Sequence, residues 1–288
     1  MMIKKGITQW KGVDADQFSE SILVVLVIYK MKIGESLAFK SLTKALQLNN
    51  QSGTLFIYDN SPQPQAYERN ENWKTIYRND PANPGVSKAY NEGFLIAKSE
   101  NKKWVLLADQ DTEFEEDIFF KYKMGIDKNP DIQLLVPVMK DTGGIVSPFH
   151  FYLGRGFRLN RIEPGIHWLS KKKVINSGLM ISLSLFEQSG GFDEQFGLDF
   201  SDLAFIQKIS PHKSSFFVID STGRHSLSSD ERHSIDETLA RFQLFCQASN
   251  TFSERGGNFW VNGWKYIRAA ILGLKYLDIR FITIAYTK

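Results

Sequence analysis

The chain has 288 residues, of which 42% are hydrophobic and 23% charged, a composition typical of a globular protein with enough chain for a full core. Its net charge of +3 is too small to indicate nucleic-acid binding, and its single cysteine, Cys246, excludes an intrachain disulfide framework and fits a reducing compartment. The first twenty residues lack the apolar core of a signal peptide, and no charge-free window of about 18 residues exists, so no membrane-spanning helix is expected.

The first part of the chain alternates between strand-like and helix-like patterns. The run at 22–29 is apolar and β-branched, which predicts a central strand. The strands that follow it are predicted at 54–58, 74–77 and 104–108, and the helices between them at 35–48 and 86–98. Strand, helix and strand in this order predict parallel pairing with right-handed crossovers.

The second part is less regular. A helix at 114–127 and a strand at 132–138 lead into a glycine-punctuated region up to residue 173, which we expect to be a mobile, partly ordered excursion over one face. Its aromatic and arginine side chains suit sugar stacking and phosphate pairing, or ordinary packing. Further elements are predicted as a strand at 174–181, a short helix from 184, a helix whose first turn carries Asp199 and Asp202, and a strand at 215–219.

The C-terminal part is expected to be helical. One helix is predicted at 235–252, and the segment 259–287 is an amphipathic stretch rich in aromatic residues and cations. Such a helix lies in a membrane interface or packs on the domain with its cations solvated. The aromatic clustering favours the membrane slightly.

Two carboxylates, Asp109 and Asp111, directly follow the apolar strand at 104–108. Ligands bind beyond the carboxyl ends of strands in open α/β sheets, and side chains two apart in extended chain point the same way. The pair can therefore hold a divalent cation against substrate phosphates, or it is only a polar turn. The Gly-containing turn at 83–85 favours an anion such as a diphosphate at the start of the next helix, or is a simple loop and cap.

Seven segments in sequence order resemble the family 2 inverting glycosyltransferases of GT-A fold. Within that family the chain is most similar to rhamnosyltransferase-like bacterial enzymes that build surface polysaccharides such as O-antigen and capsule. The matching segments are Tyr29, Asp59-Asn60-Ser61, 83–97, 106–112, 175–182, 190–205 and His225-Ser226. Two departures are Lys30, where the family often has Asn, and Leu203-Ala204, where it often has an acidic or aromatic pair.

This resemblance implies a Rossmann-like α/β fold with a mostly parallel central sheet, flanking helices and a helical C-terminal extension. The implied domain is 21–233, with a nucleotide-sugar half at 21–112 and an acceptor half at 113–233. An N-terminal arm at 1–20 precedes it, and the helical extension occupies 234–288.

The resemblance also implies roles for individual residues. The donor would contact Tyr29, Asp59, Asn83, Gly85, Lys88, Asp109 and Gln110, with Tyr29 and Asp59 at the base and Asp59 accepting from a pyrimidine N–H. A Mn²⁺ or Mg²⁺ ion would be bound by Asp111, Asp109 and His225. Asp202 would be the general base, with Asp199 as the alternative base or an acceptor ligand. Ser177, Gly178 and Phe196 would line the acceptor side.

The expected reaction is metal-dependent, single-displacement transfer of a sugar to a hydroxyl of a lipid-linked or growing polysaccharide. The donor would be dTDP-rhamnose or a UDP-hexose, and the partners would not include nucleic acid. The expected location is the cytoplasm, either free in it or at the inner face of the cytoplasmic membrane. The alternatives are an inactive GT-A module that binds a sugar nucleotide and an Asp-nucleophile phosphatase, which Glu113 and the late motif disfavour. A nucleotidyltransferase is disfavoured by the segment 30–34.

Overall fold

The computed structural model describes residues 18–225 and 234–287. The strands are β1 (Ile22–Ile28), β2 (Gly53–Asp59), β3 (Trp73–Asn79), β4 (Trp104–Asp109), β5 (Thr112–Glu113), β6 (Leu134–Asp141), β7 (Gly144–Ser147), β8 (His150–Tyr152), β9 (Arg155–Phe157), β10 (Gly165–Trp168), β11 (Met180–Ser182) and β12 (Ser215–His225). The helices are η1 (Ile33–Glu35), α2 (Leu37–Leu48), α3 (Val86–Ser99), α4 (Ile118–Lys128), α5 (Leu183–Ser189), α6 (Ser201–Ile209), α7 (Ile235–Glu254), α8 (Trp260–Tyr276) and α9 (Arg280–Tyr286). Most of the predicted N-terminal arm, together with Ser226, lies outside the described residues.

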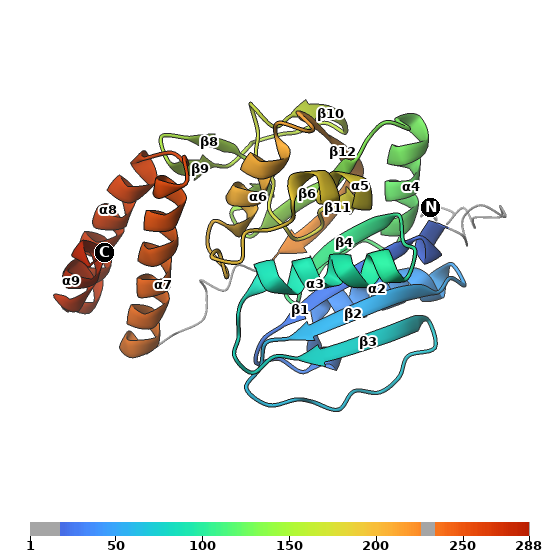
Figure 1. The fold of residues 1–288 in the computed structure, drawn as a ribbon, viewed down its shortest axis with the longest axis horizontal. Helices are drawn as coiled ribbons and strands as arrows, with labels where there is room; N and C mark the ends of the chain where they lie inside the picture. The colour runs from blue at the N-terminus through green and yellow to red at the C-terminus, as the bar shows by residue number, and fades with distance from the viewer. Residues whose placement is uncertain (1–17, 226–233, 288) are drawn as a thin grey trace, which may run out of the picture.

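One mixed sheet with the order β10-β12-β6-β11-β4-β1-β2-β3 forms the centre of the molecule (Figure 1). Strands β4, β1, β2 and β3 are parallel neighbours, as the strand–helix–strand pattern predicts. Strand β11 runs antiparallel between β4 and β6, so the parallel order is interrupted in the second half of the chain. The carboxyl ends of β1, β2 and β4 therefore meet at one edge of the sheet.

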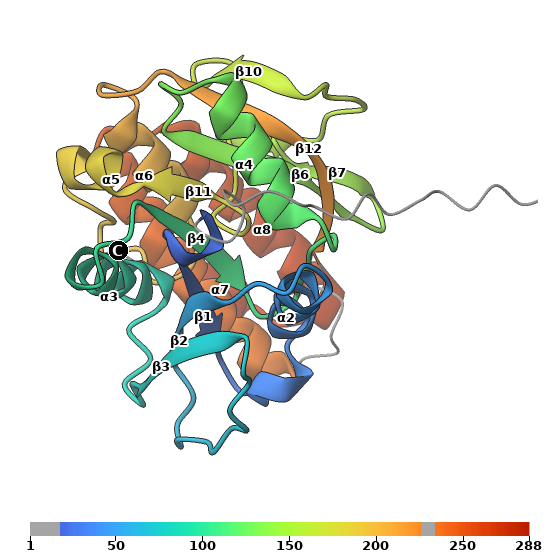
Figure 2. The same cartoon turned by 90° about the vertical axis from the view of Figure 1, so that its right-hand side faces the viewer.

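Side-chain alternation along β1 divides the core into two layers. Leu23, Val25 and Val27 face the cluster formed with α3, α5 and α6, whereas the intervening residues face α2 and α4. Figure 2 shows these two groups of helices on opposite sides of the sheet. All seven residues of β1 are buried, because both faces of the strand are covered.

The region 139–173 is more ordered than the sequence indicates. It forms β7, which pairs with β6, and β10, which pairs with the distant β12 at the edge of the sheet. Strands β8 and β9 form a separate hairpin. This hairpin reaches the C-terminal helices, where the indole N–H of Trp264 donates to the carbonyl of Leu153 at 2.7 Å. The region therefore contains more regular structure than the expected partly ordered excursion. Of its strands, β10 pairs with a partner far away in sequence, whereas β7, β8 and β9 pair with neighbouring strands.

The C-terminal segment contains three helices where two were expected. Leu277 adopts a left-handed conformation, φ 52°, which ends α8 and starts the turn to α9. Helices α7, α8 and α9 share a small core that includes the buried Cys246. Among the residues the structure describes, no helix combines the length and the apolar character needed to cross a membrane.

Candidate active site

The carboxyl end of β4 carries the first two candidate carboxylates. Strand β4 ends at Asp109, and Gln110 and Asp111 form a turn, so the two carboxylates do not share one extended strand as the alternation rule supposed. The backbone of Gln110 binds the start of α2, because its carbonyl accepts from the N–H of Leu37 at 2.9 Å and the hydroxyl of Ser36 at 2.9 Å. This turn is therefore fixed from the neighbouring helix.

A chain of hydrogen bonds joins this turn to the end of β12. The Ser177 hydroxyl accepts from the N–H of Asp109 at 3.0 Å and lies 2.7 Å from the Thr112 hydroxyl. The Thr112 hydroxyl is also 2.8 Å from Nδ1 of His225, which in turn lies 3.5 Å from Oδ1 of Asp111. The structure thus brings Asp111 and His225 together, although 114 positions separate them in the chain.

Burial changes the chemistry of these acids. It raises the pKa of Asp111 to about 6, the nearby His225 opposes the rise, and Asp109 adds to it. The Tyr90 hydroxyl donates to Oδ1 of Asp109 at 2.9 Å. The pKa of Tyr90 is held well above its usual range by burial and by the negative charges of Asp109, Asp202 and Asp111. Tyr90 is therefore a neutral donor at this cluster.

Asp202 lies in the first turn of α6, and the charge of Asp109 at the end of β4 acts on it. Burial raises its pKa to about 6, its bond from the N–H of Leu203 opposes the rise, and Asp199 and Asp109 add to it. A carboxylate with a pKa near neutrality is suited to accept a proton in a reaction. The structure thus places Asp202, Asp109 and Asp111 in one electrostatic environment.

Asp199 precedes α6 and is already paired. It forms a bidentate ion pair with Arg241 of α7, including a 2.9 Å bond from Nη2 of Arg241 to Oδ1. Both oxygens of Asp199 are therefore engaged by the guanidinium. This geometry favours Asp202 over Asp199 as a base. Arg241 was missed by the sequence analysis.

Two residues predicted at the nucleotide base differ in their availability. Tyr29 is 41% exposed at the end of β1, and its backbone N–H donates to Oε1 of Gln110 at 2.7 Å. Asp59 is fully buried, and its carboxylate accepts from the N–H of Ser61, from Gln65 and from Tyr77, each at 2.9 Å. In this conformation Asp59 orders the loop after β2 and does not offer a free oxygen to a base.

The start of α3 is enclosed by the loop that precedes α6. Gly85 has φ 95°, and a Cβ there would lie 2.1 Å from the carbonyl oxygen of Gly197, so only glycine fits. That same carbonyl accepts from the N–H of Val86 at 2.7 Å, so the first amide of α3 is not free for an anion. Asn83 adopts the left-handed conformation, and Lys88 lies 3.4 Å from Asp80.

The residues predicted on the acceptor side have packing roles in this structure. Gly178 has φ 80°, and a Cβ there would meet Met139 at 2.4 Å. Ser177 is buried in the hydrogen-bond chain described above. Phe196 is buried against Phe252 of α7, with ring centroids 6.2 Å apart. All three residues are buried.

The donor set fits a metal ion that is shared with a substrate. Within residues 18–225 and 234–287, no group of three or more His, Cys, Asp and Glu side chains could hold an ion by itself. Asp111 and His225 supply two converging donors, and Mg²⁺ is commonly bound by one or two carboxylates together with substrate phosphates and water. The residues present therefore fit an ion that binds together with a phosphate-bearing ligand.

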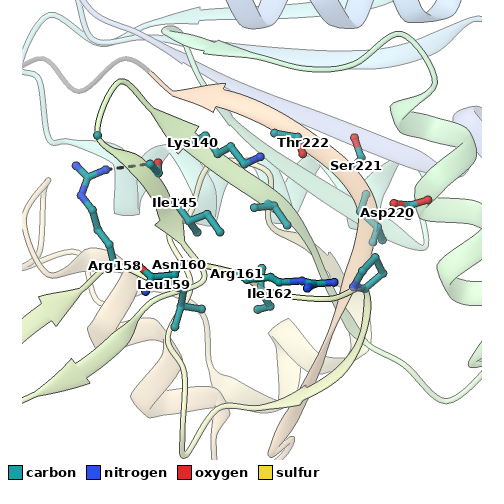
Figure 3. A pocket seen from close by; sticks show the side chains of 15 residues that line it. Lys140, Ile145, Arg158, Leu159, Asn160, Arg161, Ile162, Asp220, Ser221 and Thr222 are labelled. Carbon is teal, nitrogen blue, oxygen red and sulfur yellow. Dashed lines mark hydrogen bonds between the residues drawn. The ribbon is translucent and has the colours of Figure 1, made fainter.

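Two cavities lie outside the carboxylate cluster. One, of about 600 Å³, is bounded by β6, β7, the segment 158–164 and β12, with Lys140, Arg158 and Arg161 around an apolar floor (Figure 3). The other, of about 760 Å³, lies between α6 and the end of α7. The predicted site residues all lie within the described range 18–225. Of these residues, Phe196 lines the second of these two cavities, and the others line neither.

Comparison with solved structures identifies the fold. A crystal structure of residues 1–349 of Staphylococcus aureus TarS matches 92% of this chain over 90% of its own, with 14% identity and a TM-score of 0.52. The same part of TarS in complex with UDP matches with 13% identity and a TM-score of 0.50, again over 92% and 90% of the two chains.

TarS is a family 2 glycosyltransferase of the GT-A fold. This chain has the GT-A fold. It spans about half of a longer TarS structure, covering 54% of it. A TarS complex with UDP-GlcNAc also matches, with 15% identity, a TM-score of 0.50, and coverage of 79% of this chain and 66% of TarS. No protein-family model and no curated protein sequence matches the chain.

Proposed function

We propose that this protein is an inverting glycosyltransferase that moves a sugar from a nucleoside diphosphate to a hydroxyl of a saccharide acceptor. The observation that carries the proposal is that the charges of Asp109, Asp111 and Asp202 all act on the buried hydroxyl of Tyr90, which donates to Asp109 at the carboxyl edge of the sheet. The shared fold with TarS, which has been crystallised with UDP and UDP-GlcNAc, supports it. Those complexes favour a UDP-sugar over dTDP-rhamnose as the first donor to test.

In the proposed reaction, Asp202 accepts the proton of the acceptor hydroxyl while that oxygen attacks the anomeric carbon. With a pKa of about 6, Asp202 is still mostly ionised at neutral pH and is more basic than an ordinary aspartate, so it can take the proton. Tyr90, as a neutral donor, orients the Asp109 carboxylate, which in the proposed reaction lies beside the leaving diphosphate. One base acting opposite the leaving group gives inversion in a single displacement.

Asp111 and His225 are the residues that would hold a divalent ion. When bound, that ion would supply Lewis-acid stabilisation of the charge on the leaving diphosphate. Thr112 orients the ring of His225, because its hydroxyl lies 2.8 Å from Nδ1.

We also propose that α8 and α9 lie against a membrane. Their outer side carries large apolar residues that are 49 to 90% exposed, namely Ile267, Ile271, Leu274, Leu277 and Ile279. The nearby Arg280 is paired with Asp278, and Lys265 is buried beside Asn250. Because these cations are engaged, binding would depend on apolar insertion more than on charge.

The membrane proposal is tested by sedimentation with phosphatidylglycerol vesicles at low and high salt. We expect the wild type to sediment at both, and Leu274→Asp to lose this. Leu244→Asp on α7, where Leu244 is 54% exposed, is the matched control. Equal sedimentation of all three proteins would contradict the proposal.

The central test is thermal unfolding with UDP, dTDP and ADP, each with and without Mn²⁺. A ligand present at a hundred times its dissociation constant stabilises the folded state by about 2.7 kcal/mol, which a melting curve detects easily. We expect a Mn²⁺-dependent shift with UDP or dTDP and none with ADP. Asp111→Asn should remove the Mn²⁺-dependent part of the shift. Asp220→Asn, a change at a side chain that is 80% exposed and paired with Lys121, should not.

No shift with any nucleotide would reject the proposal. A shift with UDP but no release of UDP from UDP-GlcNAc would instead favour an inactive module that binds the nucleotide. Orthophosphate release from a phosphomonoester that survives Asp202→Asn would favour the phosphatase alternative.

A further inference from the structure

Helix α7 and its C-terminal cap form two ion pairs with the segment that precedes Asp202. Near its start, Arg241 forms the bidentate ion pair with Asp199. At its C-terminal cap, Arg255 forms an ion pair with Asp193. The loop between Asp193 and Asp199 is therefore held at both ends by one helix of the C-terminal unit.

Aromatic contacts lie between the two ion pairs. The ring of Phe252 stacks on the ring of Phe200, with centroids 5.3 Å apart. The ring of Phe245 also packs against Phe200, with centroids 5.6 Å apart. Phe200 has φ 62°, a conformation that is unfavourable for a bulky residue and persists only when its surroundings hold it. Because Phe200 directly precedes α6, its backbone sets the direction of the turn that contains Asp202.

We propose that Arg241 is a positioning residue for Asp202, and that α7 is part of the catalytic machinery and not a separate appendage. This inference rests on the assignment of Asp202 as the base. Arg241 acts through Asp199, which lies three residues before Asp202, and holds the left-handed turn at Phe200 in place.

The loss of Arg241 would also change the charges that act on Asp202. The groups that act on it are Asp199 in its own loop and Asp109 at the end of β4, and both raise its pKa. The neutral Tyr90 of α3 lies in the same cluster, and Arg268 of α8 lies within reach of Asp199. Without Arg241, the charge of Asp199 would be compensated less, and Asp202 would be harder to ionise.

The test compares Arg241→Met with Arg255→Met. The two arginines belong to the same helix, bind the same loop and are similarly exposed, at 40% and 48%. The first readout is an NMR titration of the aspartate carboxyl carbons, with the Asp202 signal assigned by its loss in Asp202→Asn. We expect Arg241→Met to raise the pKa of Asp202 above about 6 and Arg255→Met to leave it unchanged.

The second readout is release of UDP from UDP-GlcNAc, with water as the acceptor. Arg241→Met should lower kcat by about tenfold to a hundredfold while the Kd for UDP stays unchanged, since misplacement of a reacting group affects the chemical step. Arg241→Lys keeps the positive charge but cannot form the bidentate ion pair. We expect this variant to have the wild-type pKa at Asp202 but only part of the wild-type kcat.

The NMR titration requires no substrate and is therefore informative even if UDP fails to bind. An unchanged Asp202 pKa in Arg241→Met, or the same shift in Arg255→Met, would overturn the positioning role. Failure of the wild type to bind any nucleotide would overturn the proposed function and leave the titration result to decide the positioning role by itself.

Discussion

Replacing Asp202 by Asn should abolish activity and, at the same time, stabilise the protein at neutral pH. The pKa of Asp202 is raised from 3.8 to about 6, so the ionised form is disfavoured in the folded state. The difference between these two pKa values corresponds to about 3 kcal/mol, since one pKa unit represents about 1.4 kcal/mol. Asn keeps an oxygen for the N–H of Leu203 and removes the charge. Because Asp202 is only partly buried, we expect a gain of about 1–3 kcal/mol in the free energy of unfolding.

The pH dependence gives the sign of this effect. The folded-state pKa lies above the unfolded value, so the ionisation penalty is absent below about pH 3.8, grows between pH 3.8 and 6, and is complete above pH 6. Urea unfolding of the two proteins at pH 8 and at pH 4.5 measures the difference. We expect the variant to be more stable at pH 8 and the gap to narrow at pH 4.5. Equal stabilities at pH 8, or a gap that widens in acid, would refute this reasoning.

Three further outcomes are expected. Gly85→Ala should lower the free energy of unfolding by about 2–4 kcal/mol, because its Cβ would meet the carbonyl of Gly197, whereas Gly34→Ala, with nothing within 4 Å, should have little effect in the same urea assay. Tyr90→Phe should lower kcat for UDP release, because Asp109 loses its only hydroxyl donor among the contacts described, while circular dichroism stays unchanged. Calorimetry should detect Mn²⁺ binding in the presence of UDP and none in its absence, and tight binding of Mn²⁺ alone would contradict the two-donor site.

The first half of the fold is well predicted from sequence because its signals are local. The apolar run of β1 and the helical spacing of α2 and α3 are each complete within one element, and the observed bounds differ from the predictions by a few residues at most. Strands β7 and β10 carry no comparable signal. Residues 165–168 become a strand because they pair with 215–218, and such long-range pairing is not visible in a window of sequence.

In the candidate site too, local sequence patterns could be predicted, whereas contacts between residues distant in sequence could not. The residues following β4 could be predicted, because a buried run ending in two acids indicates a sheet edge. The structure adds the partners of these residues. Arg241 lies 42 positions from Asp199, and a single arginine on a helix carries no sign of its contact. The enclosed state of Asp59 also depends on Tyr77 and Gln65, which only the folded loop brings together.

The sole cysteine, Cys246, can report on the separation of the three C-terminal helices. Cys246 is 2% exposed in the core that α7 shares with α8 and α9, and burial raises the pKa of its thiol to about 11. A thiol reagent therefore reacts only when these helices separate. The labelling rate at increasing urea, compared with global unfolding, will show whether α7 can leave the sheet domain while the rest of the chain stays folded.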